Sequence, residues 1–338
     1  MPAACLSQLP GLAWVNGVVW TRGKAGLAAL AALVPIAGCT IPPPPGDSPL
    51  RYRDAVFSSI GVTRDLTYGS APDNDGNPVA LKLDLYQPTG DTVARRPAVV
   101  YVHGGGFSHG GKSGGAAFAT YLVQRGYVAV SIDYRLLAPL GCGGHRDPSP
   151  ECEAAAMAAQ HDAQAAVRWL RANASTYWID PNRIAMAGAS AGAITSLLVD
   201  WRPEDPGTSG NPGYSSAIRG AVSISGGIPT NDYITKDDSP AIFFHGTEDP
   251  VVFYDWALAN AAAMYNLGIL TVFEPFDGAA HGLVQAGYGD VINQQSSYFL
   301  YAVLDLAQAD GQSAAAARPF ASYERKLREQ YPQARLAP

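Results

Sequence analysis

The chain has 338 residues, with 23 Lys or Arg against 29 Asp or Glu, which gives a formal net charge of −6 at pH 7. This balance excludes the broad basic surface with which proteins bind nucleic acid. With 47% hydrophobic and only 15% charged residues, the chain can bury a sizeable core and does not have the composition of a disordered protein.

The N-terminus predicts an export signal over residues 1–38. Arg22 and Lys24 precede an apolar run at 25–38, and the first acidic residue is Asp47. A basic start followed by a short apolar run is typical of a signal that directs a chain out of the cytoplasm. The run is shorter than the roughly 20 residues that a membrane-spanning helix needs.

Cys39 directly follows this run. The stretch Ile36-Ala37-Gly38-Cys39 resembles the lipobox of bacterial lipoproteins, in which the cysteine becomes lipidated and forms the mature N-terminus. The resemblance implies an exported bacterial protein. Lipid attached to Cys39 would anchor this protein to a membrane of the cell envelope. An ordinary cleaved signal, which would release a secreted protein, is the alternative.

The proline-rich stretch after the signal predicts a tether at 39–54, because consecutive prolines favour an extended chain. The main domain is expected at 55–312. Residues 313–338 then form a C-terminal tail with no evident catalytic part.

Strands and helices are expected to alternate along the main domain. Residues 79–85 alternate between apolar and polar, which predicts a strand with one solvent-facing side near a sheet edge. Apolar runs typical of buried parallel strands lie at 97–102, 127–132, 183–187, 221–225, 241–244 and 270–273. Helical patterns lie at 116–125, 154–174, 191–200, 254–265 and 292–306. This order predicts an α/β fold with a mostly parallel, doubly wound sheet, helices on both faces, and at most a small cap from 201–216 and 226–239.

The body of the chain contains two cysteines, Cys142 and Cys152, on either side of a loop rich in glycine and proline. Two thiols in an exported chain usually pair, so we predict a disulfide that would stabilise the fold by about 2–3 kcal/mol. A metal site that recruits His145 or His161 is the alternative, although the CxxC spacing typical of such sites is absent.

A G-x-S-x-G motif, Gly188-Ala189-Ser190-Ala191-Gly192, lies between an expected strand and an expected helix. A sharp turn from strand to helix lifts one side chain above the sheet, and flanking glycines leave room for the strained backbone. Ser190 would thus project its hydroxyl beside a helix N-terminus, where negative charge is favoured. We therefore predict that Ser190 is a nucleophile.

A serine nucleophile needs a base and an acid that orients the base. Asp249 follows the expected strand at 241–244, and His281 follows the expected strand at 270–273. Because the carboxyl ends of parallel strands meet at one edge of a sheet, these side chains should lie near Ser190. Asp133, which also ends a strand, is the alternative acid.

The stretch His103-Gly104-Gly105-Gly106-Phe107 follows the strand at 97–102. Consecutive glycines let backbone N–H groups approach a substrate oxygen without interference from Cβ atoms. Such donors stabilise the negative charge that develops on an attacked carbonyl. His103 itself, like His245, ends an apolar strand and is expected to be a local hydrogen-bond anchor.

Together these motifs resemble the carboxylesterase and hormone-sensitive-lipase-like branches of the α/β-hydrolase superfamily, across about residues 55–308. The resemblance implies an oxyanion hole from the N–H groups of Gly105, Gly106 and Ala191, and an activity on carboxylic esters. It requires no metal and no organic cofactor. We expect short-chain acyl esters as substrates, whereas acetylated or feruloylated saccharides and small amides remain open alternatives.

A second motif points to a different class of enzyme. Residues 106–113, from Gly106 to Ser113, match the G-x-x-x-x-G-K-S pattern of phosphate-binding loops, and Asp133 is in a position to bind Mg²⁺. This nucleotide-hydrolase alternative leaves Ser190, Asp249 and His281 without a role. The other alternative is a catalytically inactive binding protein with the hydrolase fold. The sequence indicates no protein partner.

Overall fold

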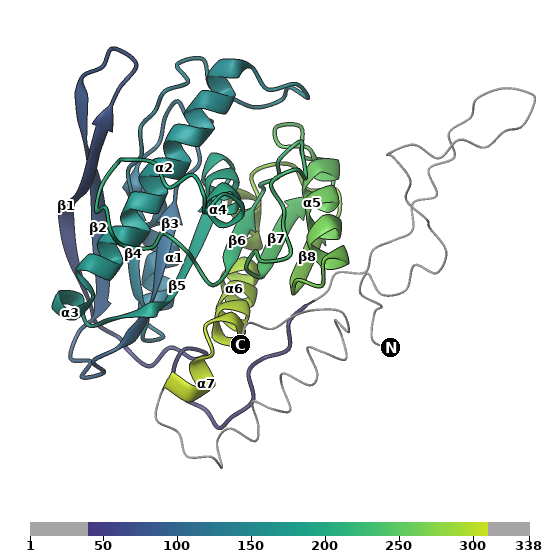
Figure 1. Cartoon of the computed structure of the whole chain (residues 1–338). Helices are drawn as coiled ribbons and strands as arrows, with labels where there is room; N and C mark the ends of the chain where they lie inside the picture. The colour runs from purple at the N-terminus through teal and green to yellow at the C-terminus, as the bar shows by residue number, and fades with distance from the viewer. Residues whose placement is uncertain (1–39, 310–338) are drawn as a thin grey trace, which may run out of the picture.

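The computed structural model describes residues 40–309, shown in colour in Figure 1. The predicted export signal at 1–38, the lipidation site Cys39 and the predicted tail at 313–338 lie outside the described residues. Between residues 40 and 309, no helix has the length and apolar character needed to cross a membrane.

Within the described residues, eight strands form one sheet in the order β1-β2-β4-β3-β5-β6-β7-β8. They are β1 (Ile60–Pro72), β2 (Pro78–Pro88), β3 (Arg96–Val102), β4 (Val128–Ile132), β5 (Ile179–Ala189), β6 (Ala221–Ile224), β7 (Ala241–Gly246) and β8 (Thr271–Phe276). The pairs β1–β2 and β2–β4 are antiparallel, and the other neighbours are parallel. The predicted mostly parallel sheet is confirmed.

Helices cover both faces of this sheet. The longer ones are α1 (Ala116–Val123), α2 (Pro150–Ala172), α4 (Ala191–Trp201), α5 (Tyr254–Asn266) and α6 (Gly289–Val303), and the short ones are η2 (Lys112–Gly115), α3 (Ala174–Tyr177), η3 (Val284–Tyr288) and α7 (Leu306–Ala309). Helices α2, α4 and α5 share one apolar core with the sheet, whereas α1 and α6 share a second core on the opposite face. The expected double winding is therefore confirmed.

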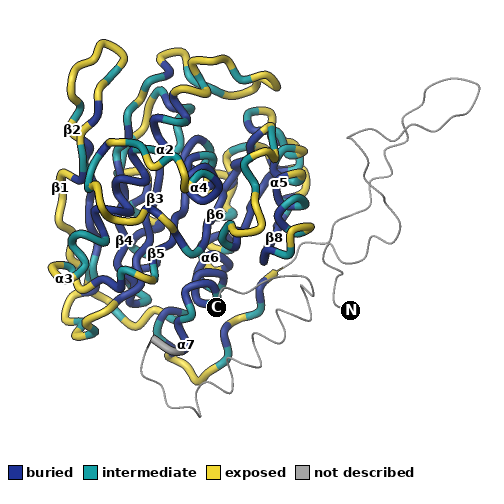
Figure 2. Tube along the Cα trace, in the orientation of Figure 1, coloured by how far each residue is buried: buried dark blue, intermediate teal, exposed yellow. Residues whose placement is uncertain are grey.

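The central strands are buried on both sides, as Figure 2 shows. Every residue of β3, β4 and β7 is buried. Because helices cover both faces, these strands consist of almost continuous apolar runs instead of alternating ones. Their apolar runs are the signal that made them predictable.

Strand β1 was not expected, and it changes the place of β2. It forms the edge of the sheet and is largely exposed and polar, so no apolar pattern marks it. The strand β2 was expected near the edge with a solvent-facing side, yet its Asp84 is only 1% exposed. Asp84 is covered by Arg64 of β1 at 3.0 Å and by Lys112 at 3.5 Å.

The segment expected to be a tether packs on the domain. Ile41, Leu50 and Tyr52 are buried, and the amide of Ile41 donates to Gln295 Oε1 of α6 at 2.6 Å. The ring of Tyr52 packs edge-on against Tyr127, with ring centroids 5.2 Å apart. From residue 40 onward, the prediction of an extended tether is therefore wrong, because scattered apolar residues anchor the prolines between them.

The two segments expected to form a cap differ from one another. Residues 202–216 run along α2, where Ser209 Oγ donates to Asp162 Oδ1 at 2.6 Å and Arg168 Nε donates to the carbonyl of Gly210 at 2.8 Å. Residues 227–230 and Tyr233 instead line a cavity beside Ser190. Only the second segment therefore contributes to the site.

Candidate active site

Ser190 occupies a strained turn between β5 and α4. Its backbone has φ 54° and ψ −120°, a left-handed conformation that is rare for a residue with a side chain. A Cβ atom at Gly188 would lie 2.1 Å from the carbonyl oxygen of Gly192, and one at Gly192 would lie 2.0 Å from that of Val102. Gly188 is therefore needed for the turn to close on itself, and Gly192 for the turn to pack against the end of β3.

His281 connects Ser190 to Asp249. Its Nε2 lies 2.7 Å from Ser190 Oγ, and its Nδ1 lies 2.7 Å from Asp249 Oδ2. An ionised carboxylate can only accept, so Nδ1 donates to Asp249 and Nε2 is left to accept the proton of the serine hydroxyl. The hydroxyl of Ser225 donates to the carbonyl of His281 at 2.8 Å and holds the histidine loop in place.

Asp249 is buried, yet it is surrounded by donors. Its Oδ1 accepts from the amides of Val251 at 2.8 Å and Val252 at 3.1 Å. Its Oδ2 also lies 3.2 Å from Nε2 of the buried His245. Burial acts to raise the pKa of Asp249, but the hydrogen bonds from His245, His281 and Val251 outweigh it and hold the pKa well below its usual value.

The alternative acid and the other histidines have separate roles. Asp133 Oδ1 accepts from the amide of Lys112 at 2.7 Å, away from the histidine of the site. His103 Nδ1 lies 2.6 Å from the carbonyl oxygen of Gly104, as expected of a local hydrogen-bond anchor, and its ring stacks on Tyr134. The contact of His245 with Asp249 is not predicted from the sequence. Its only trace there is the four-residue spacing between His245, within β7, and Asp249.

The glycine loop after β3 lies against the serine turn. A Cβ atom on Gly104 would lie 3.2 Å from that of Ser190, and Gly105 and Gly106 have positive φ values of 121° and 58°. Among the described residues, the amides of Gly105 and Gly106 donate to no acceptor. Ala191 is the first residue of α4, where an amide has no partner within the helix.

The phosphate-loop pattern at 106–113 does not form a phosphate cradle. The amides of Ser108 and His109 donate to the carbonyl of Gly105 at 3.0 and 3.2 Å. The ammonium of Lys112 lies 3.0 Å from a carboxylate oxygen of Asp65, and two further carboxylates surround it. Because carboxylates already pair with the ammonium group of Lys112, the geometry does not favour the nucleotide-hydrolase alternative.

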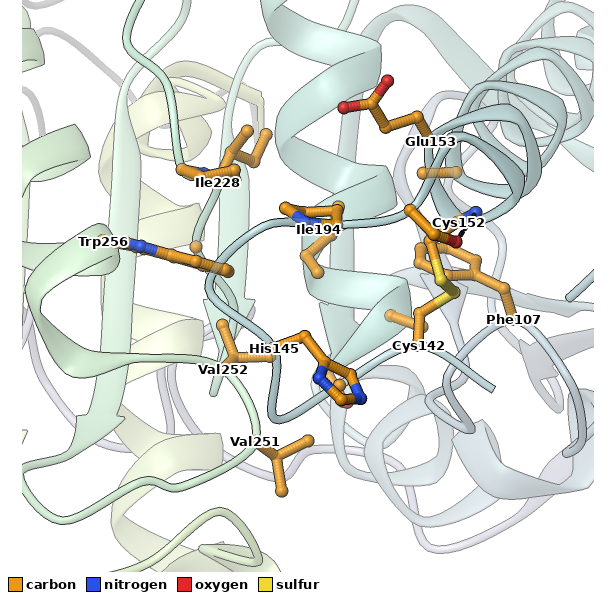
Figure 3. Close-up of a pocket in the computed structure, with 18 of the residues that line it drawn as sticks. Phe107, Cys142, His145, Cys152, Glu153, Ile194, Ile228, Val251, Val252 and Trp256 are labelled. Atoms are coloured by element: carbon orange, nitrogen blue, oxygen red, sulfur yellow. Dashed lines mark hydrogen bonds between the residues drawn. A yellow bond between two sulfur atoms is a disulfide. The ribbon is translucent and has the colours of Figure 1, made fainter. Parts of the chain in front are cut away.

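A cavity of about 510 Å³ opens beside Ser190. Figure 3 shows its walls: Ile194 of α4 lies at the back, Trp256 of α5 and Ile228 on one side, and Phe107 on the other. This volume lies within the roughly 300–1,000 Å³ range of small-molecule sites. The nucleophile thus faces an apolar cavity of the size of a small organic ligand.

Cys142 and Cys152 form a disulfide at the rim of this cavity, with their Cα atoms 5.7 Å apart. The bond uses both thiols, which removes them from the alternative metal site. Within residues 40–309, no group of three or more potential metal-binding side chains is present.

The chain resembles known esterases in sequence and in structure. The family profile BD-FAE matches residues 83–212. Esterase LipC of Mycobacterium tuberculosis is 30% identical over 206 residues, which are 60% of this chain and 44% of LipC. The probable isoprenylcysteine alpha-carbonyl methylesterase ICMEL1 of Oryza sativa is 34% identical over 137 residues, which are 40% of this chain and 27% of that protein. The present chain thus matches less than half the length of these curated relatives.

The likeness to a solved esterase extends over more of the fold. The propionate-bound structure of Thermogutta terrifontis esterase 2 superposes with a TM-score of 0.57 at 26% identity, and the match covers 74% of this chain and 94% of that one. By its sheet, its serine turn and these similarities, the chain belongs to the α/β-hydrolase superfamily, and it is similar to esterases in both sequence and structure.

Proposed function

We propose that the protein is a serine carboxylesterase that hydrolyses short-chain acyl esters. The single observation that carries the proposal is the hydrogen-bonded chain from Asp249 through His281 to Ser190, which ends at an apolar cavity. A hydroxyl that donates to a histidine held by a buried carboxylate is the arrangement that activates serine for attack on an acyl carbon.

In the proposed mechanism, Ser190 Oγ attacks the ester carbonyl while His281 Nε2 takes the hydroxyl proton. Asp249 holds the imidazole in the required tautomer and stabilises its charged form. His281 then gives the proton to the leaving alcohol, which leaves an acyl group on Ser190. A water molecule, deprotonated by His281, releases the acid and restores the serine.

The negative charge on the attacked carbonyl oxygen needs donors beside the serine. Three backbone amides are suited to this role, those of Gly105, Gly106 and Ala191. Among the described residues, the first two donate to no other acceptor. Each such donor can contribute about 2.7–4 kcal/mol to stabilisation of the transition state.

The proposed preference for short acyl chains rests on the cavity and on the solved relatives. The cavity of about 510 Å³ is bounded by apolar side chains and by the disulfide-closed loop. Structures of the Thermogutta terrifontis esterase hold propionate and butyrate, which are short-chain carboxylates. Both observations favour esters of small acids.

We further propose that the protein is exported and held at a membrane by lipid on Cys39. Tyr52 packs on Tyr127 just before β4, so residues 40–54 lie at the amino ends of the parallel strands, whereas Ser190 follows β5 at the carboxyl ends (Figure 1). An anchor at Cys39 would therefore leave the cavity at the end of the sheet away from the membrane, where it meets water-soluble esters. Mass spectrometry of the mature N-terminus tests the lipid; an unlipidated N-terminus supports the secretory alternative.

Labelling with a fluorophosphonate tests the nucleophile directly. The reagent should modify Ser190 in the folded protein, and peptide mapping should find the adduct on the peptide that contains it. Ser190→Ala should abolish the labelling, whereas Ser58→Ala, at an exposed serine, should not change it. Labelling that persists in Ser190→Ala would refute the assignment.

A further inference from the structure

The disulfide-closed loop at 142–152, here called the strap, forms one side of the cavity. Most of its residues line the cavity, and Figure 3 shows His145 in front of the opening with Cys142 and Cys152 at one end. Ser190, which precedes α4, lines the same cavity. The strap therefore faces the space in which a substrate of Ser190 would lie.

The two ends of the strap, Cys142 and Cys152, lie side by side and are fixed to the glycine loop and to α2. The amide of Cys142 donates to the carbonyl of Gly106 at 2.9 Å, and the disulfide ties Cys142 to Cys152 in the first turn of α2. Ser149 Oγ accepts from the amide of Cys152 and caps that helix. A covalent bond and the first turn of α2 therefore hold the two ends of the strap together.

The middle of the strap lies on the loop that carries Asp249. The amide of Gly144 donates to the carbonyl of Val251 at 2.8 Å. Arg146 forms an ion pair with Asp255 at 2.7 Å, and its guanidinium lies 4.3 Å from the centroid of the Phe253 ring. Both partners of the ion pair are 60% exposed. The strap thus bridges the cavity from the glycine loop to the start of α5.

From these contacts we infer that the strap is the specificity-determining wall of the cavity and limits the length of the acyl chain that Ser190 accepts. The inference rests on the proposed esterase function. The bridge across the cavity consists of one main-chain hydrogen bond and the contacts of the exposed Arg146 with Asp255 and the Phe253 ring, which are weak interactions at an exposed site. The disulfide is therefore the main restraint that keeps the wall in place.

The test compares hydrolysis of p-nitrophenyl butyrate with that of p-nitrophenyl laurate. In the double variant Cys142→Ser, Cys152→Ser, the ratio of kcat/KM for laurate to that for butyrate should rise about tenfold, because a released wall admits the longer chain. Arg146→Ala, which removes the ion pair with Asp255 and the contact with the Phe253 ring, should raise this ratio about two- to threefold. Arg95→Ala is the matched control: Arg95 is 62% exposed and pairs with Asp180, before the start of β3, so the ratio should not change.

Reduction of the folded wild-type protein with a phosphine gives the same comparison without a substitution, and it serves if the double variant does not fold. It should also raise the ratio about tenfold. A fall in kcat by the same factor for both esters would overturn the inference, since it would show that the strap only positions the glycine loop through Gly106. An unchanged ratio would overturn it as well and leave the esterase function standing. If the wild-type protein hydrolysed neither ester, the proposed function would be overturned, and the inference with it.

Discussion

Two buried carboxyl groups on the β7–β8 side of the sheet have opposite properties. Asp249, just beyond β7, is 5% exposed, and Glu274, within β8, is 7% exposed. The pKa of Asp249 is held well below its usual value, whereas burial raises the pKa of Glu274 to about 7. Nearly equal burial thus accompanies shifts of opposite sign.

The difference lies in the donors around each group. Asp249 receives two backbone amides and faces two histidines. Within the described residues, Glu274 Oε2 has no hydrogen-bond partner. Desolvation disfavours a carboxylate unless donors replace its water, so donors decide whether a buried charge is stable. The site keeps its charge because the chain places donors around it.

Ser190→Ala should have the largest effect, because it removes the end of the hydrogen-bonded chain that begins at Asp249. We expect turnover of p-nitrophenyl butyrate to fall by roughly 10⁶-fold with substrate binding largely kept. Steady-state kinetics measure this, with Ser58→Ala as the control that should keep the wild-type rate. A variant that retained a near-normal rate would contradict the proposed role of Ser190.

Asp249→Asn comes next, with Glu274→Gln as its matched control. An amide in place of the carboxylate no longer fixes the tautomer of His281, so kcat should fall on the order of 10⁴-fold. Glu274→Gln replaces an equally buried carboxyl outside the hydrogen-bonded chain and should leave kcat unchanged. If Asp249→Asn caused only a mild loss while Asp133→Asn caused a severe one, Asp133 would be the orienting acid.

The sequence predicted the sheet and brought together most of the site because both depend on short, strong local patterns. Buried apolar runs mark β3 to β8, and the turn at Ser190 requires its own two glycines. In an α/β sheet the carboxyl ends of the strands meet at one edge, so Asp249 and His281 could be placed near Ser190 without coordinates. Local sequence patterns and the topology of the sheet were together sufficient to predict that these three side chains lie close to one another.

The features that the sequence did not predict depend on contacts between distant segments. Strand β1 has no apolar alternation, since it is largely exposed; it is held by pairing with β2 and by contacts with distant segments, such as the hydrogen bond from the buried Tyr68 hydroxyl to the carbonyl of Asp133. Packing of Ile41 on α6 joins residues 254 positions apart, which no local pattern encodes. The bridge from Arg146 to Asp255 is likewise visible only once the strap and α5 are placed in space.

Glu274→Gln should have the smallest effect, and it acts on stability and not on turnover. The pKa of Glu274 is about 7 in the folded protein, against an ordinary value of 4.5. Between these values, the unfolded chain releases the proton while the folded protein keeps it. The free energy of unfolding therefore falls as pH rises from 4.5 to 7, by up to about 3 kcal/mol, and stays lowered above that range.

Urea unfolding of wild type and Glu274→Gln at pH 5 and pH 8 isolates this contribution. Burial also raises the pKa of Asp200, so the wild-type stability contains a second decrease of the same sign. That decrease is common to both proteins and cancels in their difference. The decrease from pH 5 to pH 8 should be smaller in Glu274→Gln by up to about 3 kcal/mol. Equal decreases in the two proteins would show that Glu274 has donors after all, and the contrast with Asp249 would then fail.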